Sequence, residues 1–371
     1  MIANNKHISY AGPSITEEDA EFVKQAVLNG FYENYKTYVQ QLERTFADYI
    51  GVKYAIATPN CTTALHLSLA ALDIKPGDEV IVTDLSCVAT AFPIHYLGAT
   101  AIFVDVDKNS MCIDPQKILK AISSKTKAIM AVHYLGHPAA MDEIMTISKS
   151  YNLPVVEDAA AAVGTRFKGE KVGKFGNFAA FSFQGAKVAV SGEGGILVAD
   201  DQSLYERAHL LANLGRNDRE CLYWSDEAGF KYTMPNLTAA LALSQMKRVD
   251  ELVDKKRRIF SQYYERLNGL EQLKVHSEEE GCFSNYCYPA VSLTPESKIT
   301  RNELLNQLLA EGIDSRPVQP RMSPMPMFQQ RYDNPTAKYL DKNAFILPSA
   351  AKLSSEDIDF VCDNIIKFLK G

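Results

Sequence analysis

The chain has 371 residues, of which 46% are hydrophobic, so it can bury a large core and is long enough for two domains. Its formal net charge of −6 at pH 7, with no evident basic cluster, argues against nucleic acid or an anionic membrane as a partner. The first residues lack the apolar core of a signal peptide, and no later apolar run is long enough to cross a bilayer, so we expect a soluble, cytoplasmic protein.

Apolar runs of strand length alternate with helix-like stretches in the first half of the chain. The strand-like runs lie at 79–84, 100–107, 127–134, 154–159, 178–183 and 194–201. The helix-like stretches lie at 62–72, 88–97, 115–122 and 139–152. This alternation predicts an α/β fold, with a mostly parallel sheet covered by helices on both faces. Ligands of such sheets collect beyond the carboxyl ends of the strands, where His133 and Asp158 lie.

The remainder of the chain indicates a second, smaller unit. A long helix expected at 249–267 carries apolar residues at helical spacing, which suits packing between domains. The unit continues with a strand and two helices, expected near 285–293, 301–311 and 354–369. No flexible linker is evident. We therefore expect a large domain of residues 1–248 and a smaller C-terminal α/β domain of residues 249–371, docked against each other.

Lys187 is the strongest indication of chemistry in the sequence. It follows the buried run 178–183 and precedes the glycine-rich segment 192–195, and Asp158 ends a strand about thirty residues earlier. Pyridoxal 5'-phosphate needs an amine for its Schiff base, a carboxylate for its ring nitrogen, and hydroxyl or amide donors for its phosphate. A lysine taken alone is usually a solvated surface group, but a glycine-rich connection between buried strands lets the backbone approach a ligand closely. The segment therefore predicts a pyridoxal phosphate site.

The cysteines and histidines indicate no other chemistry. Cysteine occurs at positions 61, 87, 112, 221, 282, 287 and 362. An odd number without a CxxC pair argues against a disulfide framework and against a structural zinc site, so we expect reduced thiols. His133 and His137 are four residues apart, but Gly136 lies between them at what looks like a strand end, so we expect no metal site.

Several motifs together resemble the DegT/DnrJ/EryC1/StrS family of sugar aminotransferases, which are fold-type I enzymes. The segments that carry the resemblance are 60–67, 76–82, 98–99, 103–107, 157–160, 181–187, 192–195 and 347–349. The resemblance covers nearly the whole chain. It implies a fold-type I architecture, pyridoxal 5'-phosphate as cofactor, and amino transfer to a nucleotide sugar for antibiotic, O-antigen or lipopolysaccharide synthesis.

The resemblance assigns roles to individual residues. Lys187 would form the Schiff base and move the proton between the cofactor and the sugar carbon. Asp158 would hold the proton of the ring nitrogen. Ser182, Thr62 and the backbone amide of Thr63 would bind the phosphate. Without the resemblance, Ser182 would be an ordinary strand hydroxyl and Thr62 a helix N-cap. A helix that begins at Thr62, however, presents its positive end to an anion.

Four positions depart from the pattern of the family. Cys61 stands where glycine is usual, which puts any unusual backbone angle there in doubt. Cys87 replaces a tyrosine or tryptophan that often covers the cofactor ring, and Ala161 replaces a polar residue that often faces the ring hydroxyl. Thr233 stands where an asparagine or arginine of the partner subunit often reaches the phosphate. We therefore expect fewer polar contacts to the cofactor and weaker retention of it.

The resemblance also implies a homodimer whose active sites lie at a twofold interface. The segment 230–236 is expected to reach towards the cofactor of the neighbouring subunit, and Asn236 is its candidate cofactor contact. A partner would also cover exposed apolar surface and so explain the solubility of a chain rich in apolar residues.

Within the family the chain most resembles the branch of perosamine synthases, which aminate C4 of a nucleotide-linked 4-keto-6-deoxyhexose. The reaction would proceed in two steps, with L-glutamate as donor and GDP or dTDP favoured over UDP. Candidate contacts to the sugar or its diphosphate are His133, Tyr32, Asn34, Tyr35 and Arg316. Each has a plain alternative, as a buried histidine, a residue at an interface or an exposed arginine.

Three other functions are alternatives to C4 amination. A C3 aminotransferase acting on a 3-keto sugar would share every cofactor motif and stays open. A related branch removes the C3 hydroxyl, but its members have histidine in place of the lysine at 187. A catalytically silent partner protein of the pathway is a third alternative, against which the intact Lys187 and Asp158 argue. The sequence leaves the nucleotide, the stereochemistry and the C2 substituent open.

Overall fold

A seven-stranded sheet forms the centre of the larger part of the molecule. The computed structural model describes residues 7–217 and 223–370. The strands lie in the order β1-β9-β8-β5-β4-β2-β3, with bounds β1 (Tyr54–Thr58), β2 (Glu79–Thr83), β3 (Thr100–Val104), β4 (Thr126–Val132), β5 (Val155–Asp158), β8 (Phe178–Ser182) and β9 (Gly195–Ala199). All run parallel except β9, which is antiparallel to both of its neighbours. The mostly parallel α/β sheet predicted from the sequence is therefore confirmed.

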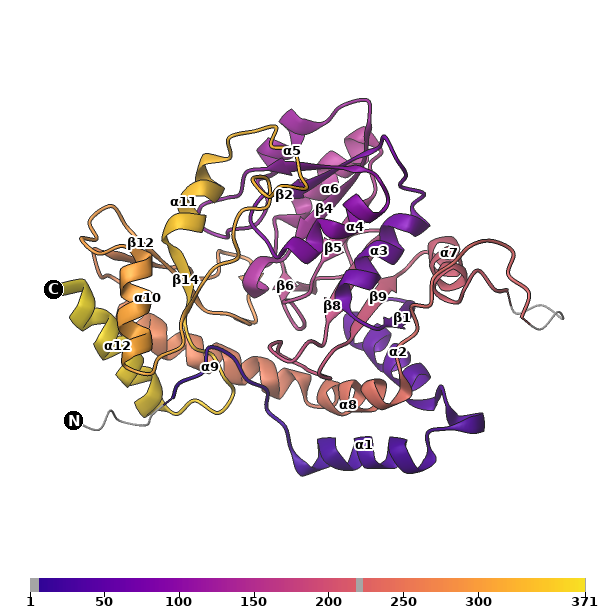
Figure 1. Ribbon diagram of the computed structural model, residues 1–371, viewed down its shortest axis with the longest axis horizontal. Helices are drawn as coiled ribbons and strands as arrows, with labels where there is room; N and C mark the ends of the chain where they lie inside the picture. The colour runs from indigo at the N-terminus through magenta and orange to yellow at the C-terminus, as the bar shows by residue number, and fades with distance from the viewer. Residues whose placement is uncertain (1–6, 218–222, 371) are drawn as a thin grey trace.

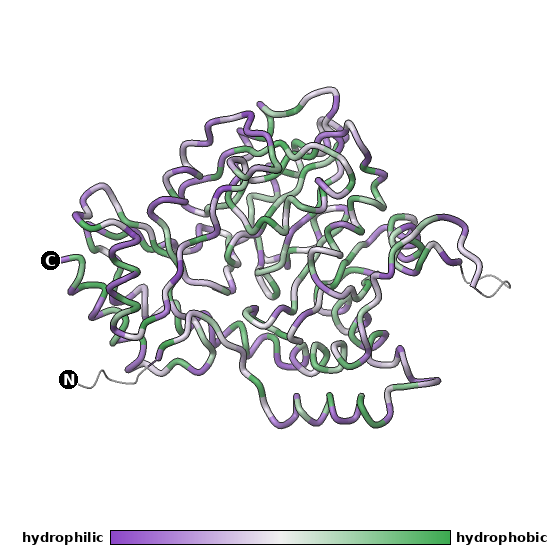
Figure 2. Tube along the Cα trace, in the orientation of Figure 1, coloured by the Kyte–Doolittle hydropathy of each residue, from purple (hydrophilic) through white to green (hydrophobic). Residues whose placement is uncertain are grey.

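Helices cover both faces of this sheet (Figure 1). They are α2 (Thr37–Ile50), α3 (Cys61–Ala71), α4 (Phe92–Tyr96), α5 (Pro115–Ala121), α6 (Met141–Tyr151), α7 (Gln202–Ala212) and α8 (Asn236–Met246). α1 (Glu17–Asn29) packs against α8. Along β2, Val80 and Val82 belong to an apolar core with α3, α4 and α7, whereas Ile81 belongs to a second core with α2, α5, α6 and α8. Successive strand residues point to opposite faces, so burial on both faces requires a continuous apolar run. Figure 2 shows this hydrophobic interior.

A second, antiparallel sheet lies beside the part of the molecule that is built on the large sheet (Figure 1). Its strands lie in the order β10-β12-β14-β13, and we call the part built on it, from residue 249 onward, the second body. The strands of this sheet and the helices around it are α9 (Val249–Leu267), β10 (Leu273–Val275), β12 (Ala290–Leu293), α10 (Arg301–Ala310), β13 (Arg316–Pro317), α11 (Pro335–Asn343), β14 (Ala344–Ile346) and α12 (Ser355–Lys370). A small sheet, β11-β6-β7, joins the two parts through β6 (Arg166–Phe167), β7 (Glu170–Lys171) and β11 (Cys282–Phe283). Three short 3-10 helices are η1 (Tyr32–Asn34), η2 (Val88–Thr90) and η3 (Tyr134–Gly136).

The predicted boundary between residues 248 and 249 coincides with the start of α9, and it stays a prediction. The structure adds that Ile8, at the other end of the chain, pairs with Ile313 and belongs to the core of the second sheet. Six cysteines are free thiols, and Cys221 lies outside the described residues. Within residues 7–217 and 223–370, no helix is both long enough and apolar enough to cross a membrane.

The strand predicted at 285–293 begins only at Ala290, as β12. Tyr286 has a φ of 47°, which interrupts an extended backbone. The side-chain amide of Asn285 donates hydrogen bonds to the carbonyl oxygens of Ala161 and Val163, at 2.9 and 2.8 Å. Residues 285–289 therefore form an irregular connection that is fastened to the loop after β5.

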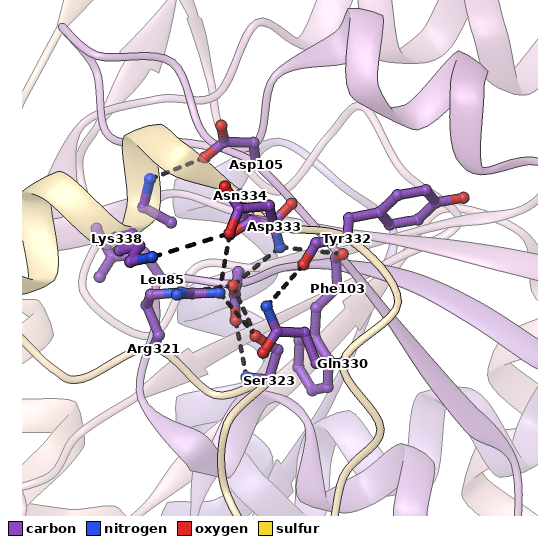
Figure 3. Close-up of polar contacts among 12 residues, drawn as sticks. Leu85, Phe103, Asp105, Arg321, Ser323, Gln330, Tyr332, Asp333, Asn334 and Lys338 are labelled. Atoms are coloured by element: carbon purple, nitrogen blue, oxygen red, sulfur yellow. Dashed lines mark hydrogen bonds and ion pairs between the residues drawn. The ribbon is translucent and has the colours of Figure 1, made fainter.

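A buried carboxylate fastens the second body to the large sheet. Asp84, just after β2, accepts hydrogen bonds from Arg321 Nε at 2.9 Å, from the Ser323 amide at 2.7 Å and from Asn334 Nδ2 at 2.9 Å. The Arg321 and Asp84 side chains are only 7% and 0% exposed. Asp105, just after β3, accepts from two amides at the start of α11. Figure 3 shows Arg321, Ser323, Asn334 and Asp105 in this cluster, which we call the Asp84 clamp.

Replacement of Arg321 by alanine is expected to lower the free energy of unfolding by about 3–5 kcal/mol, because it leaves the Asp84 charge buried without its cation. The matched control is Lys338→Ala in the same region, since Lys338 pairs with Asp333 at 3.9 Å and both side chains are exposed. That change should cost at most about 1 kcal/mol. Urea unfolding followed by circular dichroism compares the two variants, and equal costs would contradict the role given to the clamp.

Candidate active site

One pocket at the carboxyl ends of the parallel strands brings together five of the residues singled out in the sequence. Lys187, Asp158, Cys87, Ala161 and His133 all line it. Asp158 is the last residue of β5, and the loop between β8 and β9 carries Lys187. The pocket thus lies where ligands of parallel sheets are expected to bind.

The carboxylate of Asp158 is buried and receives hydrogen bonds from neutral groups. Its Oδ2 accepts from Thr90 Oγ1 at 2.7 Å, and its Oδ1 accepts from the Ala160 amide at 3.1 Å. A buried carboxylate with neutral donors is stabilised further by a cationic partner. The protonated ring nitrogen of pyridoxal phosphate is such a partner, so this side of the pocket fits the cofactor.

The amine of Lys187 lies beside an aromatic ring. Its Nζ is 5.4 Å from the centroid of Tyr288, a cation–π contact. Burial raises the pKa of Tyr288, and its hydroxyl donates to the carbonyl oxygen of Ala186 at 3.0 Å. Tyr288 therefore fixes the loop that carries Lys187 and covers the lysine from the side of the second body.

The start of β9 brings Ser182 close to the amino end of α3. Gly195 pairs with Ser182 on one side and with Thr58 on the other. A Cβ atom on Gly195 would lie 2.4 Å from the carbonyl carbon of Asn60 and 2.5 Å from the amide nitrogen of Cys61, so only glycine allows this approach. The hydroxyl of Ser182 and the positive end of α3 suit the phosphate of the cofactor.

The amino end of α3 is closed by a capping box. The amide of Thr63 donates to Asn60 Oδ1 at 2.9 Å, and the amide of Asn60 donates to Thr63 Oγ1 at 3.3 Å. A phosphate would therefore compete with Asn60 for the Thr63 amide. Thr62 is half-buried at the second position of the helix. The phosphate roles of Thr62, Thr63 and Ser182 stay predictions.

Cys61 is the first residue of α3, and it is absent from the positive-φ residues of the described chain, so it needs no glycine-like backbone there. Burial and the nearby charge of Asp158 raise the pKa of its thiol well above the usual range, although Lys187 opposes the shift. Cys87, in contrast, is exposed at the pocket. Neither residue supplies the aromatic cover that the family often has, and Tyr288 is the aromatic ring beside Lys187.

Both ring nitrogens of His133 are engaged inside the protein. Its Nδ1 accepts from the Ala139 amide at 3.0 Å, so Nε2 carries the proton and donates to Glu157 Oε2 at 2.9 Å. Both side chains are fully buried. A substrate contact through either nitrogen would break one of these bonds. The ring fixes the end of β4 against β5, and its predicted role in substrate binding stays a prediction.

Four predicted residues, Tyr32, Asn34, Tyr35 and Asn236, lie apart from this pocket within the chain. Tyr32 and Tyr35 are 88% and 58% exposed beyond the end of α1. The side-chain amide of Asn236 donates to the carbonyl oxygens of Gly30 and Asn34, at 2.9 and 3.2 Å, and its oxygen accepts from the Tyr38 amide. Asn236 therefore holds the segment with the two tyrosines. Its contact to a partner's cofactor stays a prediction.

Arg316 is connected to the pocket through two stacked rings. Its guanidinium pairs with Asp314 at 3.0 Å and lies 3.8 Å from the ring centroid of Tyr10. Tyr10 in turn stacks on Tyr288, with 6.5 Å between the ring centroids. Because Tyr288 lies beside Lys187, this arrangement places a partly exposed cation near the rim of the pocket.

Sequence reasoning missed five polar residues that line the pocket: Ser86, Thr90, Tyr134, Tyr288 and Gln319. The hydroxyl of Tyr134, in η3, donates to Gln319 Oε1 at 2.5 Å, so the two bodies meet at the pocket. Tyr288 and Gln319 come from the second body, and no local pattern marks them. Thr90 could have been found from the sequence, because it and Ser86 are two hydroxyl residues that follow the carboxyl end of β2.

Comparisons with known proteins agree with this geometry. A model of the DegT/DnrJ/EryC1/StrS aminotransferase family matches residues 13–366. A GDP-perosamine synthase of Escherichia coli O157:H7 is 38% identical over 364 residues, which cover 98% of this chain and 99% of that protein. One of Caulobacter vibrioides is 38% identical over 358 residues, covering 95% and 96%. The crystal structure of an aminotransferase TlmJ from Streptoalloteichus hindustanus has a TM-score of 0.92 at 26% identity, covering 98% and 99%. The predicted fold-type I architecture is thereby confirmed.

Proposed function

Since the chain belongs to the DegT/DnrJ/EryC1/StrS aminotransferase family, whose enzymes use pyridoxal 5'-phosphate, we propose that it aminates the C4 ketone of a nucleotide-linked 4-keto-6-deoxyhexose with L-glutamate as donor. The observation that carries the chemistry is the meeting of Lys187 and Asp158 in one pocket. The similarity to two GDP-perosamine synthases over nearly the whole chain supports the substrate class, and GDP as the nucleotide. The products would be 2-oxoglutarate and a 4-amino sugar for O-antigen or other unusual sugar synthesis.

The residues of the site would have different roles in the reaction. When bound, pyridoxal 5'-phosphate supplies an electron-accepting ring that carries the amino group. Lys187 Nζ would accept and return the proton at the carbon that gains or loses nitrogen. Asp158 would keep the ring nitrogen protonated, and Thr90 and Ala160 hold its carboxylate in place. Ser182 and the first turn of α3 would bind the phosphate.

The proposal includes a homodimer in the cytoplasm. Leu28, Phe31, Tyr32 and Tyr35 are between 54% and 88% exposed on one part of the surface, at the end of α1 and in the segment that follows it. A second subunit would remove this apolar surface from water. The partner would also bring Tyr32 and Tyr35 within reach of a substrate, together with the segment held by Asn236.

A panel of substrates tests the proposed reaction. Protein, added pyridoxal phosphate and glutamate are incubated with GDP-, dTDP- and UDP-linked 4-keto- and 3-keto-6-deoxy sugars, and the products are analysed by mass spectrometry. The proposal expects an amine on a 4-keto sugar, with GDP as the preferred nucleotide. Turnover of 3-keto sugars alone would establish the C3 alternative. A protein that binds the cofactor but transfers no amine from glutamate would fit the silent pathway partner.

Ala161→Gln is expected to tighten cofactor binding, because Ala161 lines the pocket without offering a polar side chain. One added hydrogen bond should lower the dissociation constant of pyridoxal phosphate by about 2- to 10-fold. Equilibrium dialysis of the apoprotein measures the change. The wild-type protein dialysed in parallel is the reference. An unchanged or larger constant would contradict the prediction that the pocket is short of polar contacts.

A further inference from the structure

Two buried hydroxyl groups lead to the carboxylate of Asp158. Ser86 Oγ lies 2.9 Å from Thr90 Oγ1, and Thr90 Oγ1 lies 2.7 Å from Asp158 Oδ2. Ser86, Thr90 and Asp158 are 3%, 1% and 4% exposed, so water does not compete freely for these bonds. All three residues line the pocket that also contains Lys187.

The chemistry of the groups fixes the direction of both hydrogen bonds. An ionised carboxylate can only accept, so the single hydroxyl proton of Thr90 is donated to Asp158. Thr90 Oγ1 is then left with lone pairs, and the Ser86 hydroxyl donates to it. Because Oδ1 of Asp158 accepts from the Ala160 amide, the carboxylate is held on both oxygens and its plane is fixed. Hydrogen bonds to a charged group are stronger than those between neutral groups.

The backbone that carries the two hydroxyls is itself held in place. Leu85 pairs with Arg321, and the adjacent Asp84 is the centre of the Asp84 clamp. Thr90 ends η2, where its amide donates to the Cys87 carbonyl at 2.9 Å. The second body therefore fixes the loop at one end, and Asp158 meets its other end through Thr90.

We propose that Thr90 is a positioning residue for amino transfer. Its hydroxyl orients the Asp158 carboxylate towards the cofactor ring nitrogen, and Ser86 aligns the Thr90 hydroxyl. The proposal rests on the proposed aminotransferase function but is independent of which sugar is the substrate. A carboxylate that is free to rotate would spend less time aligned with the ring nitrogen, so both cofactor affinity and the rate of the glutamate half-reaction depend on this hydroxyl.

Thr90→Val removes the hydroxyl with little change of shape, and Thr90→Ser keeps it. In Thr90→Val, we expect the dissociation constant of pyridoxal phosphate to rise and the rate of the glutamate half-reaction to fall, each by about 10- to 100-fold. KM for glutamate should change less than about 3-fold, because Thr90 acts on the cofactor through Asp158. Thr90→Ser should restore both quantities to within about 3-fold of wild type. The pH dependence of the absorption band of the bound cofactor should change only in Thr90→Val.

A buried threonine outside the pocket provides the matched control. Thr165 is fully buried, and its hydroxyl donates to the Gly136 carbonyl at 2.8 Å. Thr165→Val should therefore lower thermal stability but leave cofactor affinity and the absorption band unchanged. Ser86→Ala, one bond farther from Asp158, gives a second test if Thr90→Val does not fold. It should weaken cofactor binding by about 3- to 10-fold.

The measurements use the full-length protein and need no sugar substrate, so failure of the 4-keto sugar assay does not affect them. Wild-type cofactor affinity and absorption in Thr90→Val would overturn the proposal. So would a Thr90→Ser variant as impaired as Thr90→Val, because the shape of threonine rather than its hydroxyl would then matter. If Ser86→Ala bound the cofactor as tightly as wild type, Ser86 would have no part in aligning the Thr90 hydroxyl.

Discussion

Lys187→Ala is expected to lower the rate of amino transfer from glutamate by at least about 1,000-fold, because it removes the amine to which we assign proton transfer. Lys187 and Asp158 line the same pocket, and the lysine Nζ lies beside the Tyr288 ring. Lys187→Arg should be equally inactive, since a guanidinium keeps the charge but does not release its proton at working pH. The release of 2-oxoglutarate in a single turnover, followed by mass spectrometry, measures the effect.

The control for both variants is Lys53→Ala. Lys53 is largely exposed and lies 3.7 Å from Asp200 in an exposed ion pair. Its replacement should leave the single-turnover rate within about 2-fold of wild type, as expected for a surface pair of small energy. Transfer by Lys187→Ala at a rate close to that of Lys53→Ala would remove Lys187 from the central role.

Asp158→Asn is the second change with a large expected effect. The amide oxygen of asparagine can still accept from the Ala160 amide, and its NH2 group can donate to Thr90 Oγ1, so the local geometry is kept while the negative charge is lost. Without that charge the ring nitrogen of the cofactor is not held protonated, and we expect the glutamate half-reaction to slow by about 100- to 1,000-fold. Stopped-flow absorbance of the bound cofactor follows the half-reaction directly.

The neighbouring carboxylate, Glu157, provides the control for Asp158→Asn, because its replacement should affect stability but not catalysis. Along β5 it points away from Asp158 and accepts hydrogen bonds from His133 and from the amides of Gly173, Phe175 and Gly176. Glu157→Gln should therefore lower the thermal midpoint of the protein but leave the cofactor dissociation constant within about 3-fold of wild type. An Asp158→Asn variant that reacts as fast as Glu157→Gln would contradict the role given to Asp158.

The central sheet and the Lys187–Asp158 pair could be predicted because both depend on local signals. Strands buried on both faces are continuous apolar runs, and the carboxyl ends of neighbouring parallel strands lie at one edge, so Asp158 and Lys187 could be expected to meet. The antiparallel direction of β9 was not predicted, because an apolar run carries no sign of its direction. β1 (Tyr54–Thr58) was not among the predicted strands, although it is as long as β2 and β3.

The parts of the pocket that depend on distant packing were not predicted. Tyr288 and Gln319 reach the pocket only because the second body lies against the carboxyl end of the large sheet, as the Asp84 clamp shows. His133 could be placed at a strand end, but its bonds to Glu157 and Ala139 depend on three-dimensional contacts. Thr90 likewise gains its significance from a hydrogen bond across 68 positions of the sequence.

The assignment of Lys187 as the Schiff-base lysine can be tested by locating the cofactor on the chain. The protein is incubated with pyridoxal 5'-phosphate, reduced with borohydride and digested, and the modified peptide is identified by mass spectrometry. We expect a single pyridoxyl label, on Lys187, and loss of that label in Lys187→Arg. A label on another lysine, or amino transfer from glutamate by a protein that cannot be labelled at Lys187, would contradict it.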